Sequence, residues 1–207
     1  MRVEIDLRII ALVLIFVFTS QAKIYFLFFL FIFLHEMAHI VVGKLFKMQI
    51  SDVSLGIFGF SAQIYCYGRE NVIAKIFTYL AGPIFNLILA FIFCLTKANI
   101  ELIQINFILG VLNLVPILPL DGGRVLKEII KVFYGNKKAS IFMIEFTKIT
   151  LIIISLIYSI AILKLKNISI LCLIFYLWSL YIIEDKKVQT LKRVYGIIEK
   201  NIEKNLV

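Results

Sequence analysis

The chain has 207 residues, of which 62% are hydrophobic and 17% are charged, and its mean hydropathy is +1.01. Soluble domains carry about 45–50% apolar and about 25% charged residues, so this composition excludes an ordinary soluble protein and indicates an integral membrane protein. The formal net charge of +9 does not indicate nucleic-acid binding, because no basic stripe with interleaved aromatic residues stands apart from the apolar runs. Anionic lipid of the inner leaflet explains the positive charge better.

Six apolar segments reach the length of about 17–25 residues that a membrane-spanning helix needs. They lie at 5–22, 24–46, 72–95, 100–120, 141–163 and 167–183. The first also resembles a secretory signal peptide, because Ser20-Gln21-Ala22 fits a signal-peptidase site. We expect a retained span instead, since Glu4 and Asp6 lie among the charges before it. The predicted fold is an all-α integral membrane protein with about six transmembrane helices.

The distribution of positive charge predicts the orientation of these spans. Of the 22 lysines and arginines, only four lie in the loops that face outside if both termini are cytoplasmic. These four are Lys23, Lys97, Lys164 and Lys166. Lysine and arginine are enriched in cytoplasmic loops of membrane proteins. We therefore expect a multi-pass protein with both termini in the cytoplasm.

The second apolar segment contains both histidines of the chain, in the run His35-Glu36-Met37-Ala38-His39. Residues four apart share one face of a helix, so both imidazoles can bind a single ion while Glu36 lies beside it. A zinc ion held by three protein ligands keeps one position for water and lowers the pKa of that water to about 7, so that a carboxylate can take the proton. The alternative is a set of structural side chains. We disfavour it, because ionisable groups within a membrane cost about 2.5–3.5 kcal/mol each.

Residues 50–69 read differently from a helix, because glycines and serines interrupt a run of β-branched and aromatic residues. This mixture predicts a short β-hairpin or a membrane-dipping sheet between the second and third spans. Backbone of this kind persists at membrane depth only where protein covers it or a water-filled cavity adjoins it. An exposed edge strand there could hydrogen-bond an extended substrate. A plain structural connector is an equally weighted alternative.

A third metal ligand is expected at Asp121, because the two histidines leave a hydrolytic zinc site one ligand short. Two prolines, Pro116 and Pro119, precede Asp121 and two glycines follow it, and these residues break the helical hydrogen-bond ladder beside the carboxylate. The alternative is that Asp121 only caps a cytoplasmic helix starting at Arg124. The histidine pair favours the ligand role, since intramembrane carboxylates rarely lack a partner.

The two motifs together resemble the paired signatures of the site-2 protease family of intramembrane zinc metalloproteases, peptidase family M50. The second signature is Asn113-x-x-Pro116-x-x-Pro119-Leu120-Asp121-Gly122, and Ala81-Gly82-Pro83-x-x-Asn86 is similar to a third recurring segment. The resemblance covers about residues 24–123. It implies a zinc metalloendopeptidase that hydrolyses a peptide bond in or near a transmembrane segment of a membrane-tethered substrate.

The resemblance also assigns roles to individual residues. It implies one zinc ion per chain, held by His35, His39 and Asp121, with Glu36 as the catalytic base. Asn86 and Asn113 match positions in the active-site surroundings, where an amide could orient the substrate backbone or an oxyanion. Hydrogen bonding between helices is the alternative role for both asparagines. The small residues of the third segment would let helices approach closely.

Within the family, the chain most resembles the compact six-span group that includes a bacterial sporulation protease releasing a sigma factor from its membrane-bound precursor. This resemblance implies a sigma-factor or other transcription-factor precursor as substrate, membrane regulatory partners and a bacterial cell membrane. The chain lacks a stretch long enough for an inserted PDZ domain. Residues 184–207 leave no room for the nucleotide-sensing CBS domain of some sporulation-type members.

The expected domain organisation is a six-span metalloprotease domain at 1–183 and a cytoplasmic tail at 184–207. Apolar residues recur at helical spacing among the lysines of the tail, which predicts an amphipathic basic helix on the inner leaflet or against a partner. The segment 124–134 has a similar pattern. Cys66, Cys94 and Cys172 are widely spaced, so we expect them to pack as small apolar residues and assign them no role.

Two other functions deserve comparison with proteolysis. A membrane metal transporter needs polar groups along the full depth of a pathway, whereas the metal-competent groups here cluster in one layer. An inactive protease-like scaffold is disfavoured because the chain retains the two histidines, the glutamate and the aspartate. Intramembrane proteolysis is therefore the function that the sequence predicts.

Overall fold

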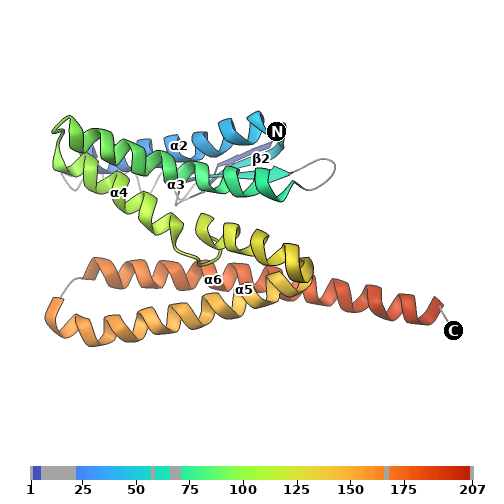
Figure 1. Ribbon diagram of the computed structural model, residues 1–207. Coiled ribbons are helices and arrows are strands. Elements are labelled where there is room, and N and C mark those ends of the chain that lie inside the picture. The colour runs from blue at the N-terminus through green and yellow to red at the C-terminus, as the bar shows by residue number, and fades with distance from the viewer. Residues whose placement is uncertain (1, 6–21, 57–58, 66–70, 166–167, 206–207) are drawn as a thin grey trace. The chain divides into compact units, whose positions relative to one another are not determined.

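The computed structural model describes residues 2–5, 22–56, 59–65, 71–165 and 168–205 (Figure 1). The described residues form two compact units, Met1–Val115 and Pro116–Val207. The first unit contains β1 (Arg2–Ile5), α2 (Ala22–Leu45), β2 (Gln49–Gly56), β3 (Gly59–Tyr65), α3 (Val72–Leu95) and α4 (Ile100–Leu114). The second contains α5 (Asp121–Leu165) and α6 (Ile168–Asn205).

In the first unit, α3 packs against both α2 and α4. The helix begins after Asn71, whose side-chain oxygen accepts a hydrogen bond from the backbone N–H of Ala74 at 3.2 Å, as an N-cap should. A close approach of α4 is possible because residue 110 is glycine. A Cβ atom there would lie 2.8 Å from Cγ of Leu87 and 3.1 Å from the carbonyl oxygen of Pro83. Small residues therefore hold the helices of this unit close together.

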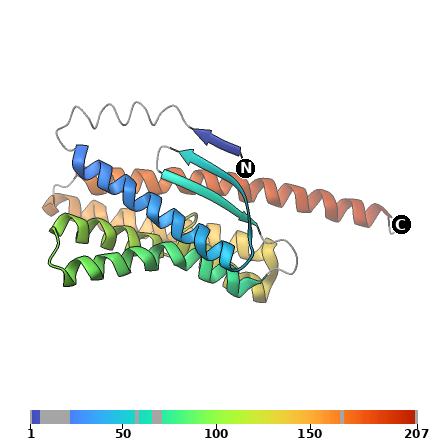
Figure 2. The same ribbon diagram turned by 90° about the horizontal axis from the view of Figure 1, so that it is seen from above.

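A three-stranded sheet with the order β1-β2-β3 completes the first unit. The β1 strand pairs with β2 in parallel, and β2 pairs with β3 as an antiparallel hairpin from Gln49 opposite Tyr65 to Gly56 opposite Gly59. Both hairpin strands contact α2, beside which they lie in Figure 2. The hairpin occupies the segment for which the sequence predicts a short β-hairpin or a membrane-dipping sheet. Its depth in a membrane stays a prediction.

Three described helices are long and apolar enough to cross a membrane, at Phe26–Leu45, Val72–Leu95 and Asp121–Ser159. They correspond to the predicted spans 24–46, 72–95 and 141–163. The predicted span 100–120 is shorter than expected, because α4 has 15 residues and ends at Leu114. The described part of α6, which contains most of the predicted span 167–183, adds no further candidate.

The predicted first span is not a single helix from residue 5, because Ile5 belongs to β1. The remainder of that segment up to residue 21 lies outside the described residues. The full count of six spans therefore stays a prediction. The same holds for two of the three cysteines, since Cys66 and the side chain of Cys172 are outside the described part. Cys94 is exposed rather than packed in a core.

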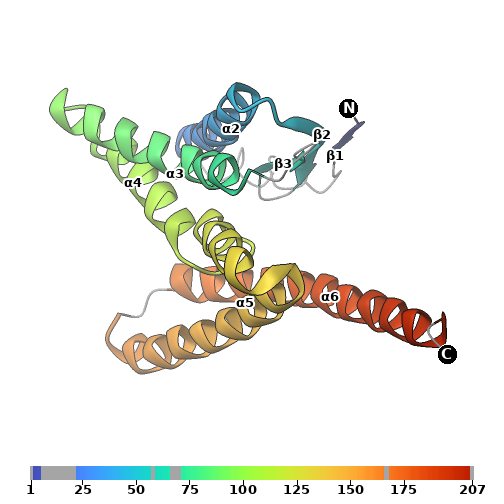
Figure 3. The same cartoon turned by 45° about the vertical axis from the view of Figure 1, so that its right-hand side comes forward.

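In the second unit, α5 bends sharply at Gly135 and its longer part packs along α6 (Figure 3). Gly135 has φ 77° and ψ 164°, a combination that is open essentially to glycine alone. Further along, the indole N–H of Trp178 on α6 donates a hydrogen bond to the hydroxyl oxygen of Ser155 on α5 at 3.1 Å. The predicted tail at 184–207 is continuous with α6 and forms no separate folded body in the described residues.

Candidate metal centre

The two histidines lie one turn apart on α2 and point in the same direction. His35 and His39 are 4% and 5% exposed, and their ring centroids are 4.8 Å apart. This arrangement follows from their spacing, since residues i and i+4 lie one above the other on a helix. Glu36 is half-buried on the same helix, directly after His35. The predicted base thus lies within the same turn as the predicted ligands.

The ring of His39 is held by the backbone of α3. Its Nδ1 lies 2.6 Å from the carbonyl oxygen of Thr78. Since a carbonyl can only accept, Nδ1 carries the proton, and in the neutral ring Nε2 is then the nitrogen that holds the lone pair. Metal-ligating histidines commonly donate their other ring N–H in this way, which fixes the ring orientation. Thr78 was not predicted from the sequence. The available signal was its spacing of four residues from Gly82, which places both on one face of α3.

Gly82 of α3 faces both histidine rings. A Cβ atom at this position would overlap Nε2 of His39 and would lie 2.6 Å from Nε2 of His35. Both Nε2 atoms therefore converge on the space above this glycine. The close approach of helices predicted from the small residues at 81 and 82 is confirmed. The two histidines consequently bring two ring nitrogens close to one point, as a metal site requires.

Three asparagines lie on the helices that surround the histidines. Asn86, one turn beyond Gly82, is fully buried, and neither polar atom of its side chain has a hydrogen-bond partner among the described residues. Asn113 is half-buried and its Nδ2 donates to the carbonyl oxygen of Leu109 at 3.0 Å. Asn106, which the sequence analysis did not single out, is fully buried and donates to the carbonyl oxygen of Leu102 at 2.9 Å. The amide of Asn86 thus has unused donors and an unused acceptor within the described part.

Asp121 is the first residue of α5 in the second unit and is 6% exposed. The alternative role for Asp121 was to cap a helix starting at Arg124. The helix begins three residues earlier, at Asp121 itself, so the predicted start of that helix is wrong. A carboxylate in the first turn of a helix interacts favourably with the helix dipole. Nη1 of Arg124 lies 3.8 Å from Oδ1 of Asp121. The N-terminus of α5 and the guanidinium of Arg124 thus both lie beside the carboxylate of Asp121.

The irregular stretch before Asp121 is anchored by α5. The backbone N–H of Leu118 donates to the hydroxyl oxygen of Thr147 at 3.1 Å, and both residues are buried. The stretch folds close against the start of the helix, where a Cβ atom at Gly123 would lie 2.7 Å from the backbone nitrogen of Leu118. Gly123 and Thr147 therefore determine where the backbone leading to Asp121 lies within this unit.

Replacing Thr147 by valine is expected to destabilise the second unit by about 1–3 kcal/mol, because valine keeps the volume but leaves the buried N–H of Leu118 without its acceptor. The matched control is Thr150→Val, since that hydroxyl donates to the carbonyl oxygen of Phe146 within its own helix turn. Denaturant unfolding of the detergent-solubilised protein measures both variants. Equal stabilities for the two variants would show that the bond from Leu118 does not anchor the stretch.

His35, His39 and Asp121 are each buried and each offers one atom that can bind a metal ion. Two imidazole nitrogens and a carboxylate oxygen form a donor set typical of catalytic zinc sites, which leave a further position open. Among the described residues, this is the set of titratable side chains that suits such an ion. The residues therefore fit zinc in their chemistry.

Comparisons with known proteins agree with the predicted family. Residues 98–157 match the model of peptidase family M50. The chain is 29% identical over 118 residues to a zinc metalloprotease of Methanocaldococcus jannaschii, an alignment that covers 52% of this chain and 34% of that protein. It is 30% identical over 119 residues to a putative zinc metalloprotease of Synechocystis sp., with 52% and 31% covered. The chain thus spans about a third of the length of these curated relatives.

The fold resembles that of a solved structure, the site-2 protease from Methanocaldococcus jannaschii. The TM-score is 0.67 at 22% sequence identity, and the alignment covers 88% of this chain and 89% of that chain. At this identity the similarity shows the fold. The family match and the zinc metalloprotease relatives agree with the predicted resemblance to peptidase family M50. The sporulation subgroup stays a prediction.

Proposed function

We propose that the chain is an intramembrane zinc metalloprotease that hydrolyses a peptide bond in or near a transmembrane segment of a membrane-tethered protein. The observation that carries this proposal is the convergence of Nε2 of His35 and Nε2 of His39 above Gly82. The bond from Nδ1 of His39 to the backbone of Thr78 adds support, because it leaves the other nitrogen available as a ligand. The matches to peptidase family M50 and to zinc metalloproteases agree with it.

In this proposal His35, His39 and Asp121 hold one zinc ion per chain. When bound, zinc supplies a Lewis acid that makes water a nucleophile near neutral pH. The first turn of α5 and Arg124 lie beside the carboxylate of Asp121 within the second unit. Gly123 and Thr147 position the backbone before Asp121 within the second unit. The ligands thus depend on supporting residues in both units.

The chain's own residues carry the proton transfers. Glu36 takes a proton from the attacking water as the water oxygen forms a bond to the substrate carbonyl carbon. The same carboxyl group gives that proton to the nitrogen of the departing amine when the C–N bond breaks. Asn86 has an amide whose donors are unused within the described residues, so it can donate to the carbonyl oxygen on which negative charge develops. Asn113 has a local bond that orients its side chain.

Substrate binding is proposed at the edge of the small sheet. The order β1-β2-β3 leaves β3 with one unpaired edge among the described strands, and an extended peptide can add to such an edge through main-chain hydrogen bonds. Unwinding is required, because a helical substrate keeps its carbonyls in its own hydrogen-bond ladder. The proposed substrate class is a membrane-tethered transcription-factor or sigma-factor precursor. The proposed topology of the protease itself has six spans and both termini in the cytoplasm.

The proposal is tested by reconstituting the purified chain with zinc and candidate membrane-tethered precursors. Asp121→Asn is expected to lose most of the bound zinc and the cleavage activity. The matched control is Asp185→Asn on α6, whose carboxylate accepts a hydrogen bond from Nε2 of Gln189 at 2.7 Å, and it should retain both. Full zinc binding and cleavage by Asp121→Asn would disprove the ligand assignment. Zinc uptake into vesicles that depends on His35, without cleavage of any precursor, would favour a transporter.

A further inference from the structure

Three apolar or aromatic side chains are exposed at the bend of α5. Val132, Phe133 and Tyr134 are 59%, 75% and 65% exposed. They are the last residues before Gly135, whose φ of 77° and ψ of 164° end the first part of the helix. A Cβ atom at Gly135 would have no neighbour within 4 Å. The bend is therefore an open corner with aromatic side chains, not a packed joint.

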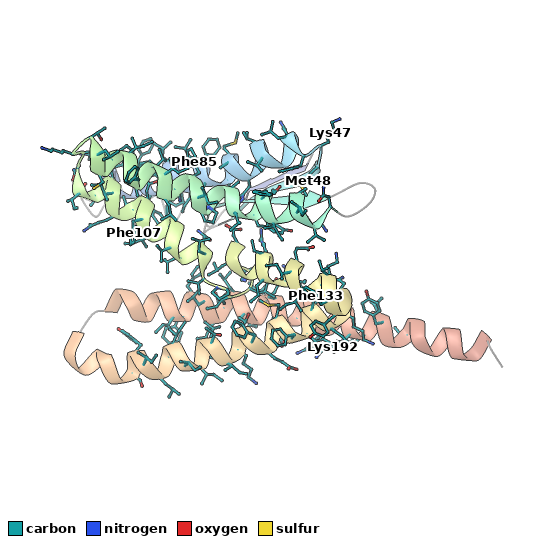
Figure 4. All side chains as sticks on the ribbon, viewed as in Figure 1. Lys47, Met48, Phe85, Phe107, Phe133 and Lys192 are labelled. Atoms are coloured by element: carbon teal, nitrogen blue, oxygen red, sulfur yellow. The ribbon has the colours of Figure 1, made fainter. Side chains whose placement is uncertain are left out.

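Basic residues flank this corner on both sides. Lys131 precedes the three exposed side chains, and Lys137 and Lys138 follow Gly135. Nζ of Lys137 lies 5.6 Å from the ring centroid of Tyr195 on α6, a distance suited to a cation–π interaction. The corner of α5 and the second half of α6 therefore lie next to each other within the second unit. Figure 4 labels Phe133 at the corner and Lys192 on α6.

The second half of α6 also combines basic and apolar side chains. Val188 is buried and Leu191 is half-buried, so this face of the helix packs inward. The opposite face is exposed and combines positive with apolar side chains. It comprises Lys186, Arg193, Val194 and Ile197. Residues 186, 193 and 197 lie on one side of a helix by their spacing. Exposed apolar side chains and positively charged side chains thus occur together on this face.

We propose that the corner and this face of α6 form a docking surface for anionic phospholipid headgroups. The surface consists of residues 132–134, Lys137 and Lys138 on α5 together with the exposed face of α6 defined above. Tyrosine, here Tyr134, sits well at the headgroup level of a bilayer, where its hydroxyl and its ring are both satisfied. Lysine and arginine near an anionic leaflet add electrostatic attraction. Their long apolar stems can lie in the interface while the charge stays in the headgroup region.

Two observations favour a lipid surface over a protein partner. Protein interfaces are depleted in lysine at their centre, whereas lysines border the exposed aromatic residues here on both sides. The corner also belongs to α5, which is long and apolar enough to cross a membrane. The helical part that follows the bend begins after Gly135, so the corner lies at the end of that apolar part, where a spanning helix meets the headgroups. The proposal does not depend on proteolysis, so its failure would leave the proposed activity untouched.

The test uses the full chain with its three cysteines replaced by serine and a spin label on Phe133→Cys. The protein is reconstituted in nanodiscs of phosphatidylcholine, alone or mixed with phosphatidylglycerol. Collisions with oxygen report contact with lipid, and collisions with a water-soluble nickel chelate report contact with water. The label should gain oxygen access and lose nickel access as phosphatidylglycerol is added, and high salt should reverse the change. A label on Ile153→Cys, an exposed apolar site of α5 away from the corner, should show no dependence on lipid charge.

A second experiment removes one positive charge from the proposed surface. In the labelled protein, Lys138→Gln should raise the phosphatidylglycerol fraction needed for half-maximal protection by about fivefold, the factor that corresponds to one basic residue near an anionic surface. The unchanged signal at Ile153→Cys shows that the variant is folded. A label at Phe133→Cys that stays open to nickel in both lipid mixtures would overturn the proposal. Protection from both reagents would also overturn it and would indicate a protein contact.

Discussion

Glu36→Gln is expected to lower the rate of peptide cleavage by a factor of about 10²–10⁴, the usual contribution of a positioned general base. The change removes the proton acceptor but keeps the size of the side chain. His35 and His39 remain in place, since their positions depend on α2 and on the backbone of Thr78. Bound zinc should therefore remain at one ion per chain. Loss of activity with retained metal separates a base from a ligand.

The measurement compares cleavage rate and zinc content for wild type, Glu36→Gln and Glu145→Gln. Glu145 is an exposed glutamate on α5, so its variant makes the same chemical change away from the site and should cleave at the wild-type rate. If Glu36→Gln cleaved as fast as this control, another group would have to take the proton. If it lost its zinc, Glu36 would belong to the ligand set.

Gly82→Ala is expected to remove most of the bound zinc, although it adds a single methyl group. The new Cβ would occupy the space where the Nε2 atoms of His35 and His39 converge. Alanine stabilises an isolated helix by about 0.8–1.0 kcal/mol relative to glycine, so helix propensity alone predicts a more stable protein. The steric effect has the opposite sign. It forces either the rings or the α2–α3 contact to move.

The matched control is Gly196→Ala on α6, where an added Cβ would have no neighbour within 4 Å. This variant should keep its zinc and gain a fraction of a kcal/mol of unfolding free energy. Metal analysis and denaturant unfolding measure both variants side by side. Equal zinc contents in Gly82→Ala and Gly196→Ala would show that the two nitrogens do not share the space above residue 82.

One helix of the fold was predicted with its bounds correct, although it contains Pro83 in its interior. The bounds of α3 match the predicted span at 72–95. The run at 100–120 was extended too far, because Pro116 disfavours helical backbone at Val115, which has φ −61° and ψ 131°. The strand β1 was not predicted at all. Its four residues pair with residues 52–55, and a local pattern carries no information about such a distant partner.

Some residues of the metal centre could be predicted from the sequence and others could not. The two histidines follow from spacing, because a helix fixes which residues share a face. Gly82 was anticipated as one of the two small residues, at 81 and 82, that let helices approach closely. The contact of His39 with Thr78 is made by a backbone carbonyl, and any residue at that position offers the same atom. The anchoring of Leu118 by Thr147 joins residues 29 positions apart, which only the tertiary structure reveals.

Zinc X-ray absorption spectroscopy of the purified chain tests whether His35, His39 and Asp121 hold a zinc ion. We expect one zinc ion per chain with imidazole nitrogen and carboxylate oxygen neighbours at about 2.0–2.2 Å and no sulfur. The first coordination shell should change in His35→Ala and in Asp121→Asn but not in Asp185→Asn. A sulfur shell at about 2.3 Å, or a spectrum that both ligand variants leave unchanged, would rule out this set of ligands.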